Sequence, residues 1–232
     1  VPGTAVVTIT DYVTLDSKEV LVNFGAAPAS DEFKSSLGKQ WTILREDKSL
    51  YNVANDALNL TTTPGDISNT SNNAGNIFLQ DANSDWTIDT KLKCDGYPSA
   101  PAQNAGIVAY QDDDNFVKLV YGASMGRGGA TGGPTPGQVQ LIAEIAGAQK
   151  AAVNVSLRDI IGADNVVYLR LVKRAETYTA YYSVDGKKFE KVGAASVALR
   201  DIKAGLMAAN GVQMMRFAMP GMPQASTPVP FK

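Results

Sequence analysis

The chain of 232 residues contains no histidine and one cysteine, Cys94. Without histidine it lacks the commonest general base and the commonest zinc ligand, so any catalysis would have to use carboxylates, lysine or tyrosine. With one cysteine, no internal disulfide can form. The sequence therefore offers no histidine-activated nucleophile, and we expect no catalysis from this chain by itself.

Long apolar runs and an excess of charge are also absent. No run of apolar residues has the length that a membrane-spanning helix needs. Basic and acidic residues number 21 and 23, which gives a net charge of −2 and no basic cluster, so we expect neither nucleic acid nor an anionic membrane as a partner. The chain begins at Val1 without a signal-peptide pattern, and we expect a mature or excised segment of a longer protein.

The sequence does contain segments in which apolar and polar residues alternate, as they do in β-strands. In Trp86–Lys93, one face would carry Trp86, Ile88, Thr90 and Leu92, and the other face the polar residues between them, which is the period of a half-buried strand. Similar strands recur every 8–12 residues and predict an all-β, two-sheet antiparallel sandwich. The other expected strands are Ala5–Ile9, Val20–Phe24, Thr42–Arg45, Ala57–Thr62, Asn76–Gln80, Gly106–Gln111, Phe116–Tyr121, Val139–Ile145, Asn165–Lys173, Tyr178–Val184, Phe189–Val192, Lys203–Ala209 and Met214–Met219.

Turn signals separate these strands. Asp112–Asn115 and Arg174–Thr177 each lie between two apolar strands and predict hairpin turns. The pair Asp185-Gly186 is typical of a tight type I′ hairpin, because these residues accept positive φ angles. The glycine-rich stretch Gly122–Gly137 is longer than most hairpin loops, and either a functional loop or a mobile surface excursion is compatible with it.

Several segments together resemble a known family. They are Asp31–Phe33, Leu37–Thr42, Arg45–Asp47, Asn76–Gln80, Gln103–Leu119 and Tyr178–Phe189. In this order they resemble the concanavalin A-like β-sandwich domain at the C-terminus of family 43 β-xylosidases, and the related regucalcin-like (DUF1349-type) sugar-associated domains. The resemblance implies a jelly-roll fold of the concanavalin A-like lectin and glucanase type, and it says little about the ligand.

Two regions depart from that resemblance. Residues 1–28 have no counterpart in it, so we expect an N-terminal extension or edge strands that pack on a sandwich of residues 29–232. The family also usually ends on a full aromatic-rich strand after a segment like Pro228–Lys232, where this sequence stops. We hypothesise that Val6–Leu15 supplies that strand from the N-terminal side.

Catalytic and metal-binding patterns are weak. Catalytic relatives with this scaffold carry Glu-x-Asp-x-x-Glu on one strand, whereas Trp86–Lys93 offers only Asp89 and Val139–Ile145 only Glu144. Asp112 and Asp114 could bind calcium through their oxygens, but the chain returns to a strand where an EF-hand would need glycine and glutamate. Asp31 and Glu32 are an alternative pair of ligands. We expect no required cofactor, and a structural Ca²⁺ is the one metal that these residues suggest.

Candidate sugar-binding residues are aromatic and polar side chains on strands and loops, since pyranose rings need flat apolar faces with polar groups around them. Lys118, Gln140 and Glu144 would share one face of adjacent strands, Arg170 could join them, and Arg127 would be a mobile contact in the glycine-rich stretch. The candidate aromatic platforms are Tyr97, Tyr110, Tyr121, Tyr182 and Trp41. A solvated outer face for the polar set, and core positions for the aromatic rings, remain open alternatives.

Three functions fit these observations. The first is a non-catalytic carbohydrate-binding or accessory domain of an exported glycoside hydrolase system, which binds polysaccharide or oligosaccharide or completes the pocket of a catalytic glycosidase domain. The second is a lectin-fold glycoside hydrolase with an unrecognised carboxylate pair. The third is a structural module between domains. We expect a secreted, periplasmic or cell-surface location in a bacterium.

Overall fold

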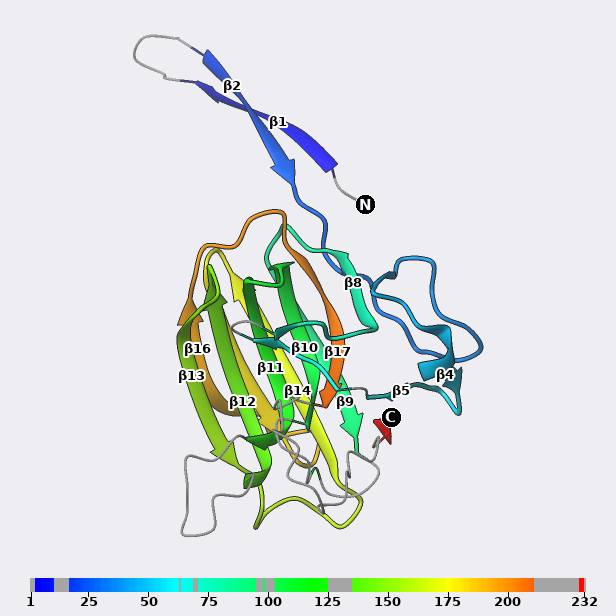
Figure 1. Cartoon of the computed structure of the whole chain (residues 1–232). Helices are drawn as coiled ribbons and strands as arrows, with labels where there is room; N and C mark the ends of the chain where they lie inside the picture. Colours follow the sequence, from blue (N-terminus) through cyan, green and yellow to red (C-terminus); the bar gives the residue numbers. More distant parts are fainter. Residues whose placement is uncertain are drawn as a thin grey trace.

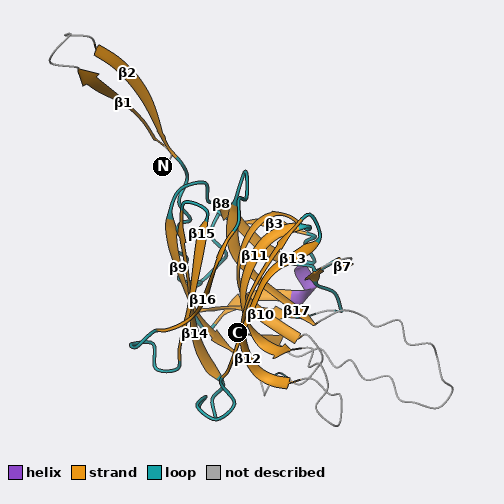
Figure 2. Ribbon diagram, turned by 90° about the vertical axis from the view of Figure 1, so that its left-hand side faces the viewer, coloured by secondary structure: helices purple, strands orange, loops and turns teal. Residues whose placement is uncertain are grey.

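The computed structural model describes residues 3–10, 17–62, 64–68, 71–94, 98, 103–124, 135–210 and 230–231. Two antiparallel sheets lie face to face, as Figure 2 shows. In spatial order, the large sheet contains β13 (Ala148–Ser156), β12 (Thr135–Ile145), β11 (Asn115–Ser124), β10 (Gln103–Asp112), β17 (Lys203–Asn210), β8 (Ile77–Asp81) and β3 (Thr42–Leu44). The small sheet contains β16 (Glu190–Ser196), β15 (Thr177–Ser183), β14 (Val166–Arg174) and β9 (Trp86–Lys93). The predicted two-sheet antiparallel sandwich is confirmed.

The main core lies between the two sheets. Every second residue of a strand points to the same face, so Leu119 and Leu141 of the large sheet meet Leu169 and Leu171 of the small sheet. All four side chains are fully buried. Each contributes about 1.5–3 kcal/mol by leaving water, and this alternation is what selects the strand register.

A second apolar cluster covers the opposite face of the large sheet. Val108, Phe116 and Met207 point away from the main core and pack against Ile67 and Ala74. The last two residues belong to the segment that carries the short hairpin of β6 (Ile67–Ser68) and β7 (Ser71–Asn72). This part of the large sheet is therefore buried on both faces.

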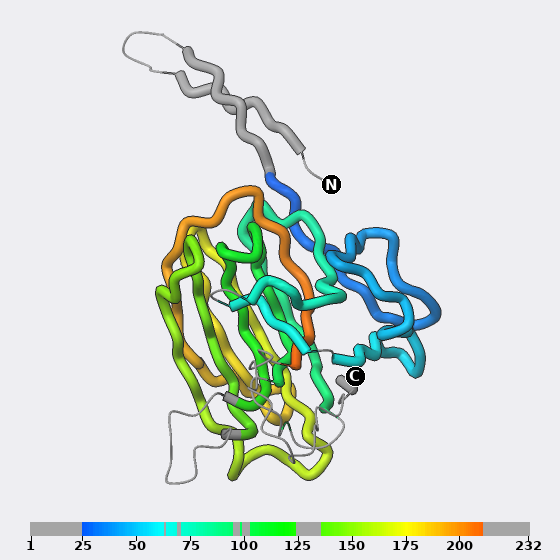
Figure 3. Tube along the Cα trace, in the orientation of Figure 1, coloured from blue at the N-terminus to red at the C-terminus, as the bar shows by residue number. Residues whose placement is uncertain are grey.

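A small third sheet lies at the side of the sandwich. It contains β4 (Tyr51–Ala54), which follows a 3₁₀ turn (η1, Lys48–Leu50), then β5 (Ala57–Thr61) and β18 (Pro230–Phe231), in the order β18-β5-β4. In Figures 1 and 3 the segment from residue 25 to β5 runs along one side of the two main sheets. The chain near its C-terminal end thus pairs with β5, through Pro230 opposite Thr61 and Phe231 opposite Leu60.

The N-terminal strands form a hairpin of their own. β1 (Gly3–Thr10) pairs with β2 (Ser17–Phe24), and within the described residues neither strand pairs with another sheet. The hypothesis that residues 6–15 supply a closing strand to the sandwich is therefore wrong for residues 6–10. Residues 11–16 lie outside the described residues.

The other predicted strands within the described residues are present, although their ends differ by a few residues. Met214–Met219 and most of the glycine-rich stretch lie outside the description. The expected tight turn at Asp185-Gly186 is wrong, because residues 184–189 all lie between β15 and β16 and only Gly186 of the pair has a positive φ, 71°. No helix among the described residues is long and apolar enough to cross a membrane.

Candidate functional site

The polar row predicted on two adjacent strands exists. β11 and β12 are neighbours, and Lys118 lies opposite Ile142, Val120 opposite Gln140, and Phe116 opposite Glu144. Residues opposite each other in an antiparallel pair share a face. Lys118, Gln140 and Glu144 therefore point to one side of the large sheet, as the sequence suggests.

That row is nevertheless covered rather than open. The Lys118 ammonium donates to Asp66 Oδ1 at 2.7 Å and to the carbonyl of Ile67 at 2.9 Å. Lys118 and Glu144 are each 1% exposed, and the segment carrying β6 and β7 supplies the groups above Lys118. Gln140 is partly exposed and donates to Asn154 of the edge strand β13. Within the described residues, Lys118 has a structural role in an internal ion pair.

Three of the predicted aromatic platforms, Tyr110, Tyr121 and Tyr182, are buried. Trp41 is partly buried, and its indole N–H donates to Asp31. Tyr121 is fully buried in the main core, so its ring packs between the sheets and presents no face to a ligand. Tyr97 and Arg127 lie outside the described residues.

Arg170 lies on a different sheet from the polar row. It is in the middle of β14, opposite Asp89 of β9 and Tyr181 of β15. Its Nε and Nη2 each donate to the Asp89 carboxylate at 2.7 Å, and its guanidinium lies 3.9 Å from the centre of the Phe189 ring. The hydrogen bonds from Arg170 to Asp89 raise the pKa of Arg170. Arg170 lies on the outer face of the small sheet, whereas the polar row lies on the outer face of the large sheet, at the opposite side of the sandwich. The expectation that Arg170 joins Lys118, Gln140 and Glu144 is therefore wrong.

Arg170 instead belongs to an aromatic surface on the outer face of the small sheet. We use this name for the half-exposed side chains of Tyr168, Arg170, Tyr181 and Phe189. Tyr168 and Arg170 are two residues apart on β14 and therefore share a face. The sequence had a signal for this surface, since Tyr168, Arg170 and Tyr181 alternate with buried residues along two strands of one hairpin.

The loop between β15 and β16 supports this surface from one side. The Asp185 carboxylate accepts hydrogen bonds from the backbone N–H groups of Lys188 and Lys187 and from the Ser183 hydroxyl, which lower the pKa of Asp185 to about 2. This fixed loop places Gly186 against the Tyr168 ring, where a Cβ atom would lie 2.9 Å from the ring. Tyr168 therefore rests on backbone, which holds its ring in place.

Of the four carboxylates predicted for calcium, Asp31, Asp112 and Asp114 accept hydrogen bonds from neighbouring groups. Asp112 Oδ1 accepts from the backbone of Asp114 and from the side chain of Asn115, and Asp114 accepts from Asn72. These bonds tie the β10–β11 turn to itself and to β7. Among the described residues no three carboxylate, cysteine or histidine side chains gather into a metal-ligand set.

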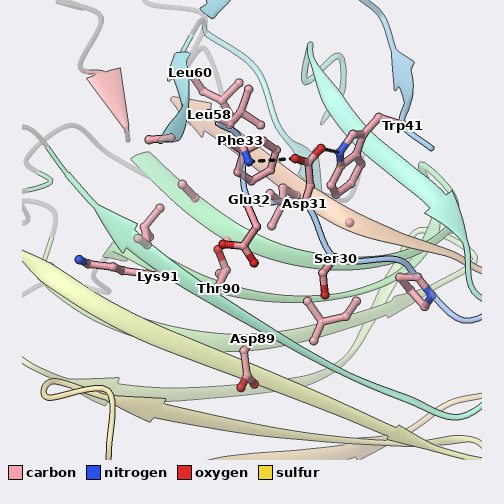
Figure 4. Close-up of a pocket in the computed structure, with 18 of the residues that line it drawn as sticks. Ser30, Asp31, Glu32, Phe33, Trp41, Leu58, Leu60, Asp89, Thr90 and Lys91 are labelled. Carbon is pink, nitrogen blue, oxygen red and sulfur yellow. Dashed lines mark hydrogen bonds between the residues drawn. The ribbon is translucent and has the colours of Figure 1, made fainter. Parts of the chain in front are cut away.

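Asp31 has a similar role in the loop before β3. Its two oxygens accept from the backbone of Phe33 and Gly38, each at 2.9 Å, and from the Trp41 indole at 2.7 Å. Burial on its own raises the pKa of Asp31, but these three hydrogen bonds outweigh it and hold the pKa below its ordinary value. Glu32 is exposed, and Figure 4 shows it pointing into a hollow beside this loop.

That hollow, which we call the β5–β9 hollow, has a volume of about 670 Å³. Leu58 and Leu60 of β5 form one wall, and β9 from Thr87 to Lys93 forms the opposite wall. Its floor is the inner face of the large sheet, where Ala105 and Ala204 are buried. The hollow thus lies at the edge of the small sheet, and several of the residues that line it belong to the main core.

The comparisons with known proteins agree with this fold. Residues 30–206 match the family described as the beta xylosidase C-terminal concanavalin A-like domain, and this match covers more than half of the chain. The chain belongs to this family. The resemblance that the sequence motifs suggest is thereby confirmed, and the hairpin of β1 and β2 precedes the matched residues.

Solved structures give the same fold for this concanavalin A-like domain. A mutant of the GH43 protein BlXynB from Bacillus licheniformis is 20% identical, with a TM-score of 0.65 over 87% of this chain and 37% of that chain. The Bacteroides ovatus xyloglucan PUL GH43B is 17% identical, with a TM-score of 0.63 over 97% and 44%. Xylan beta-1,4-xylosidase from Bacillus halodurans is 18% identical, with a TM-score of 0.60 over 97% and 44%. This chain therefore spans less than half the length of each of these neighbours, and at these identities the likeness shows the fold alone. No curated protein matches the chain.

Proposed function

We propose that this concanavalin A-like domain is a non-catalytic accessory domain of an exported glycoside hydrolase system, and that it binds polysaccharide through the aromatic surface. The observation that carries the proposal is the fixed guanidinium of Arg170. Asp89 holds it by two hydrogen bonds, Phe189 stacks beneath it, and Tyr181 lies opposite it on the next strand. Rigid aromatic rings beside a planar charged group supply the apolar faces and the directional polar contacts that sugar recognition needs.

Xylan and xyloglucan are the first polysaccharides to test, because the names of two structural neighbours contain these polymers. Native gels that contain soluble xylan, xyloglucan or dextran would measure binding as retarded migration. We expect one of the first two polymers to retard the domain and dextran to leave it unaffected. No retardation by any plant polysaccharide would overturn the proposal.

Variants locate the site. Tyr181→Ala and Arg170→Ala are expected to weaken binding roughly tenfold, the effect of about 1.4 kcal/mol. Arg170→Lys should also weaken it, because lysine cannot keep both hydrogen bonds to Asp89 and the stacking on Phe189. Arg158→Ala is the matched control, since Arg158 is exposed outside this surface. Retardation that persists unchanged in both alanine variants would place the sugar elsewhere.

The same purified domain tests whether catalysis is absent. We expect no release of 4-nitrophenol from 4-nitrophenyl β-xyloside and no shortening of xylan. Turnover by the isolated domain, lost in a Glu32→Gln or Asp89→Asn variant, would instead support a lectin-fold hydrolase that uses carboxylates near the β5–β9 hollow.

A catalytic glycosidase domain is the protein partner that this proposal includes. The family description names a C-terminal domain of beta xylosidases, and the solved neighbours are more than twice as long as the region that matches this chain. Polysaccharides of this kind lie outside the cell, so a secreted, periplasmic or cell-surface location also belongs to the proposal.

A further inference from the structure

Exposed lysines border the aromatic surface on both edge strands of the small sheet. Lys191 of β16 lies opposite Tyr181 of β15, and Lys91 of β9 lies opposite Tyr168 of β14. Residues opposite each other in an antiparallel pair share a face, so both lysines lie on the outer face beside the aromatic rings. Both are exposed. A cation therefore stands at each side of the aromatic surface.

Neither lysine is neutralised by a carboxylate of this chain. Within the part of the chain that the structure describes, neither Lys91 nor Lys191 belongs to an ion pair. The Lys91 ammonium instead lies 6.0 Å from the centre of the Tyr168 ring, so its charge is beside a ring of the aromatic surface. Both ammonium groups are thus available to an anionic group of a ligand that lies on this face.

The carboxylates around the aromatic surface are already bound by other groups. Asp89 accepts two hydrogen bonds from Arg170, and Asp185 accepts from the backbone of its own loop. Glu190 lies 3.3 Å from the ammonium of Lys188 and pairs with it. The two bordering lysines therefore leave an excess of positive charge on this face. The whole chain has a net charge of −2, so attraction of an anionic polymer would be a local property of this surface and not of the protein as a whole.

The spacing of the two lysines suits a polymer that crosses the strands. β16 and β9 are separated by β15 and β14, so the two lysine positions lie three strand spacings apart, about 14 Å at 4.8 Å each. A polysaccharide that lies across Tyr181 and Arg170 would reach both ammonium groups. A single exposed ion pair contributes little, so the aromatic rings would supply most of the affinity and the lysines would select between neutral and acidic polymers.

We propose that the aromatic surface selects an acidic polysaccharide, one that carries uronic acid carboxylates along its chain, and that Lys91 and Lys191 bind these carboxylates. This inference rests on the proposed binding of polysaccharide by the same surface, and it names the chemical class of the polymer.

The probes are xylan with glucuronic acid side groups and the same polymer after reduction of its carboxyl groups to alcohols. Reduction keeps the sugar rings and their linkages and removes the charge. Isothermal titration calorimetry with the whole chain should show binding of the acidic polymer about tenfold tighter than that of the reduced polymer at 20 mM NaCl. At about 300 mM NaCl the difference should shrink, because salt screens exposed charges.

The outcomes separate this inference from the proposed function. Equal binding of both polymers would overturn the selection of acidic polysaccharide and would leave sugar binding by the domain supported. Binding of neither polymer would overturn both proposals. Dextran sulfate that binds as tightly as the acidic xylan would mean attraction to any polyanion, which also overturns the assignment to uronic acids.

Charge-removing variants locate the carboxylate contacts. Lys91→Gln and Lys191→Gln are each expected to weaken binding of the acidic xylan about threefold and to leave binding of the reduced polymer unchanged, whereas Tyr181→Ala should weaken both. Lys150→Gln is the matched control, because it removes the same charge from the exposed edge strand β13 of the large sheet. An equal loss in Lys150→Gln, or no loss in the double variant Lys91→Gln/Lys191→Gln, would overturn the proposed contacts.

Discussion

The ammonium of Lys118 lies 2.7 Å from the carboxylate of Asp66, although 52 positions separate the two residues in the sequence. The two side chains are 1% and 6% exposed, so both charges are removed from water. Their attraction, together with the bond from Lys118 to the carbonyl of Ile67, offsets the cost of that removal. The pair fastens the segment carrying β6 and β7 to the face of the large sheet.

Lys118→Met is expected to lower the free energy of unfolding by about 3–5 kcal/mol, because it leaves the Asp66 carboxylate buried without its partner. Urea denaturation followed by tryptophan fluorescence measures this change. The double variant Lys118→Met/Asp66→Asn should lose less than Lys118→Met alone. Lys150→Met on the exposed edge strand β13 is the control and should change stability little. Equal losses for the single and double variants would contradict an ion-pair role.

Asp31 makes part of the stability depend on pH. The pKa of Asp31 is lower in the folded chain than its ordinary value of 3.8. The ionised carboxylate therefore adds to the free energy of unfolding above pH 3.8, and this addition is lost as the pH falls through the lower pKa of the folded state. In Asp31→Asn the NH₂ group of the amide replaces one accepting oxygen, so one N–H donor loses its acceptor. We therefore expect the free energy of unfolding to fall by about 1–3 kcal/mol at neutral pH. The variant's stability should also fall less steeply below pH 4 than that of the unchanged chain. Chemical denaturation at several pH values tests both effects, with exposed Asp159→Asn as the control.

Gly186→Ala should strain the support of the aromatic surface. Gly186 has a φ of 71°, and an added Cβ would lie 2.9 Å from the Tyr168 ring. We expect a stability loss of about 1–3 kcal/mol and displacement of Tyr168, seen by thermal unfolding and by NMR of the ring protons. Gly75→Ala is the comparison, because its Cβ would meet only an ordinary contact at 3.5 Å. An unmoved Tyr168 ring would argue against this support.

Removal of divalent metal tests the remaining expectation about calcium. Asp31, Asp112 and Asp114 already accept hydrogen bonds from neighbouring groups. We therefore expect the unfolding temperature to be the same with excess EDTA and with millimolar Ca²⁺. A rise of several degrees with Ca²⁺, removed by Asp112→Asn, would restore the calcium hypothesis for the β10–β11 turn.

Much of the strand framework is predictable because each strand carries its own periodicity. Trp86–Lys93 has the same bounds in the prediction and in the structure, since its inward and outward residues differ strongly in polarity. β13 is missing from the prediction, because Ala148–Ser156 is an edge strand with mostly small and polar residues. Its signal is the pair Ala146-Gly147, whose φ angles of 53° and 69° form a tight turn after β12.

The site was less predictable because it depends on contacts between distant segments. The sequence places Lys118 and Glu144 on one face correctly, but it carries no sign that the segment around Asp66 covers that face. Arg170 was singled out, yet its partners come from elsewhere in the chain: Asp89 lies on β9, and Phe189 lies in the loop before β16. The alternation of apolar and polar residues shows which residues of a strand share a face. It does not show which sheet the strand joins, because that depends on the strand order of the whole domain.

The strand order has a consequence for how the chain folds. β10, β11, β12 and β13 are joined by successive hairpins, so their contacts involve residues close in sequence and can form early. β17 instead inserts between β10 and β8, and its paired residues lie 93 to 107 positions after those of β10 and 122 to 128 positions after those of β8. Completion of the large sheet must therefore wait until most of the chain has been synthesised, and until then the facing edges of β10 and β8 are exposed to incorrect pairing.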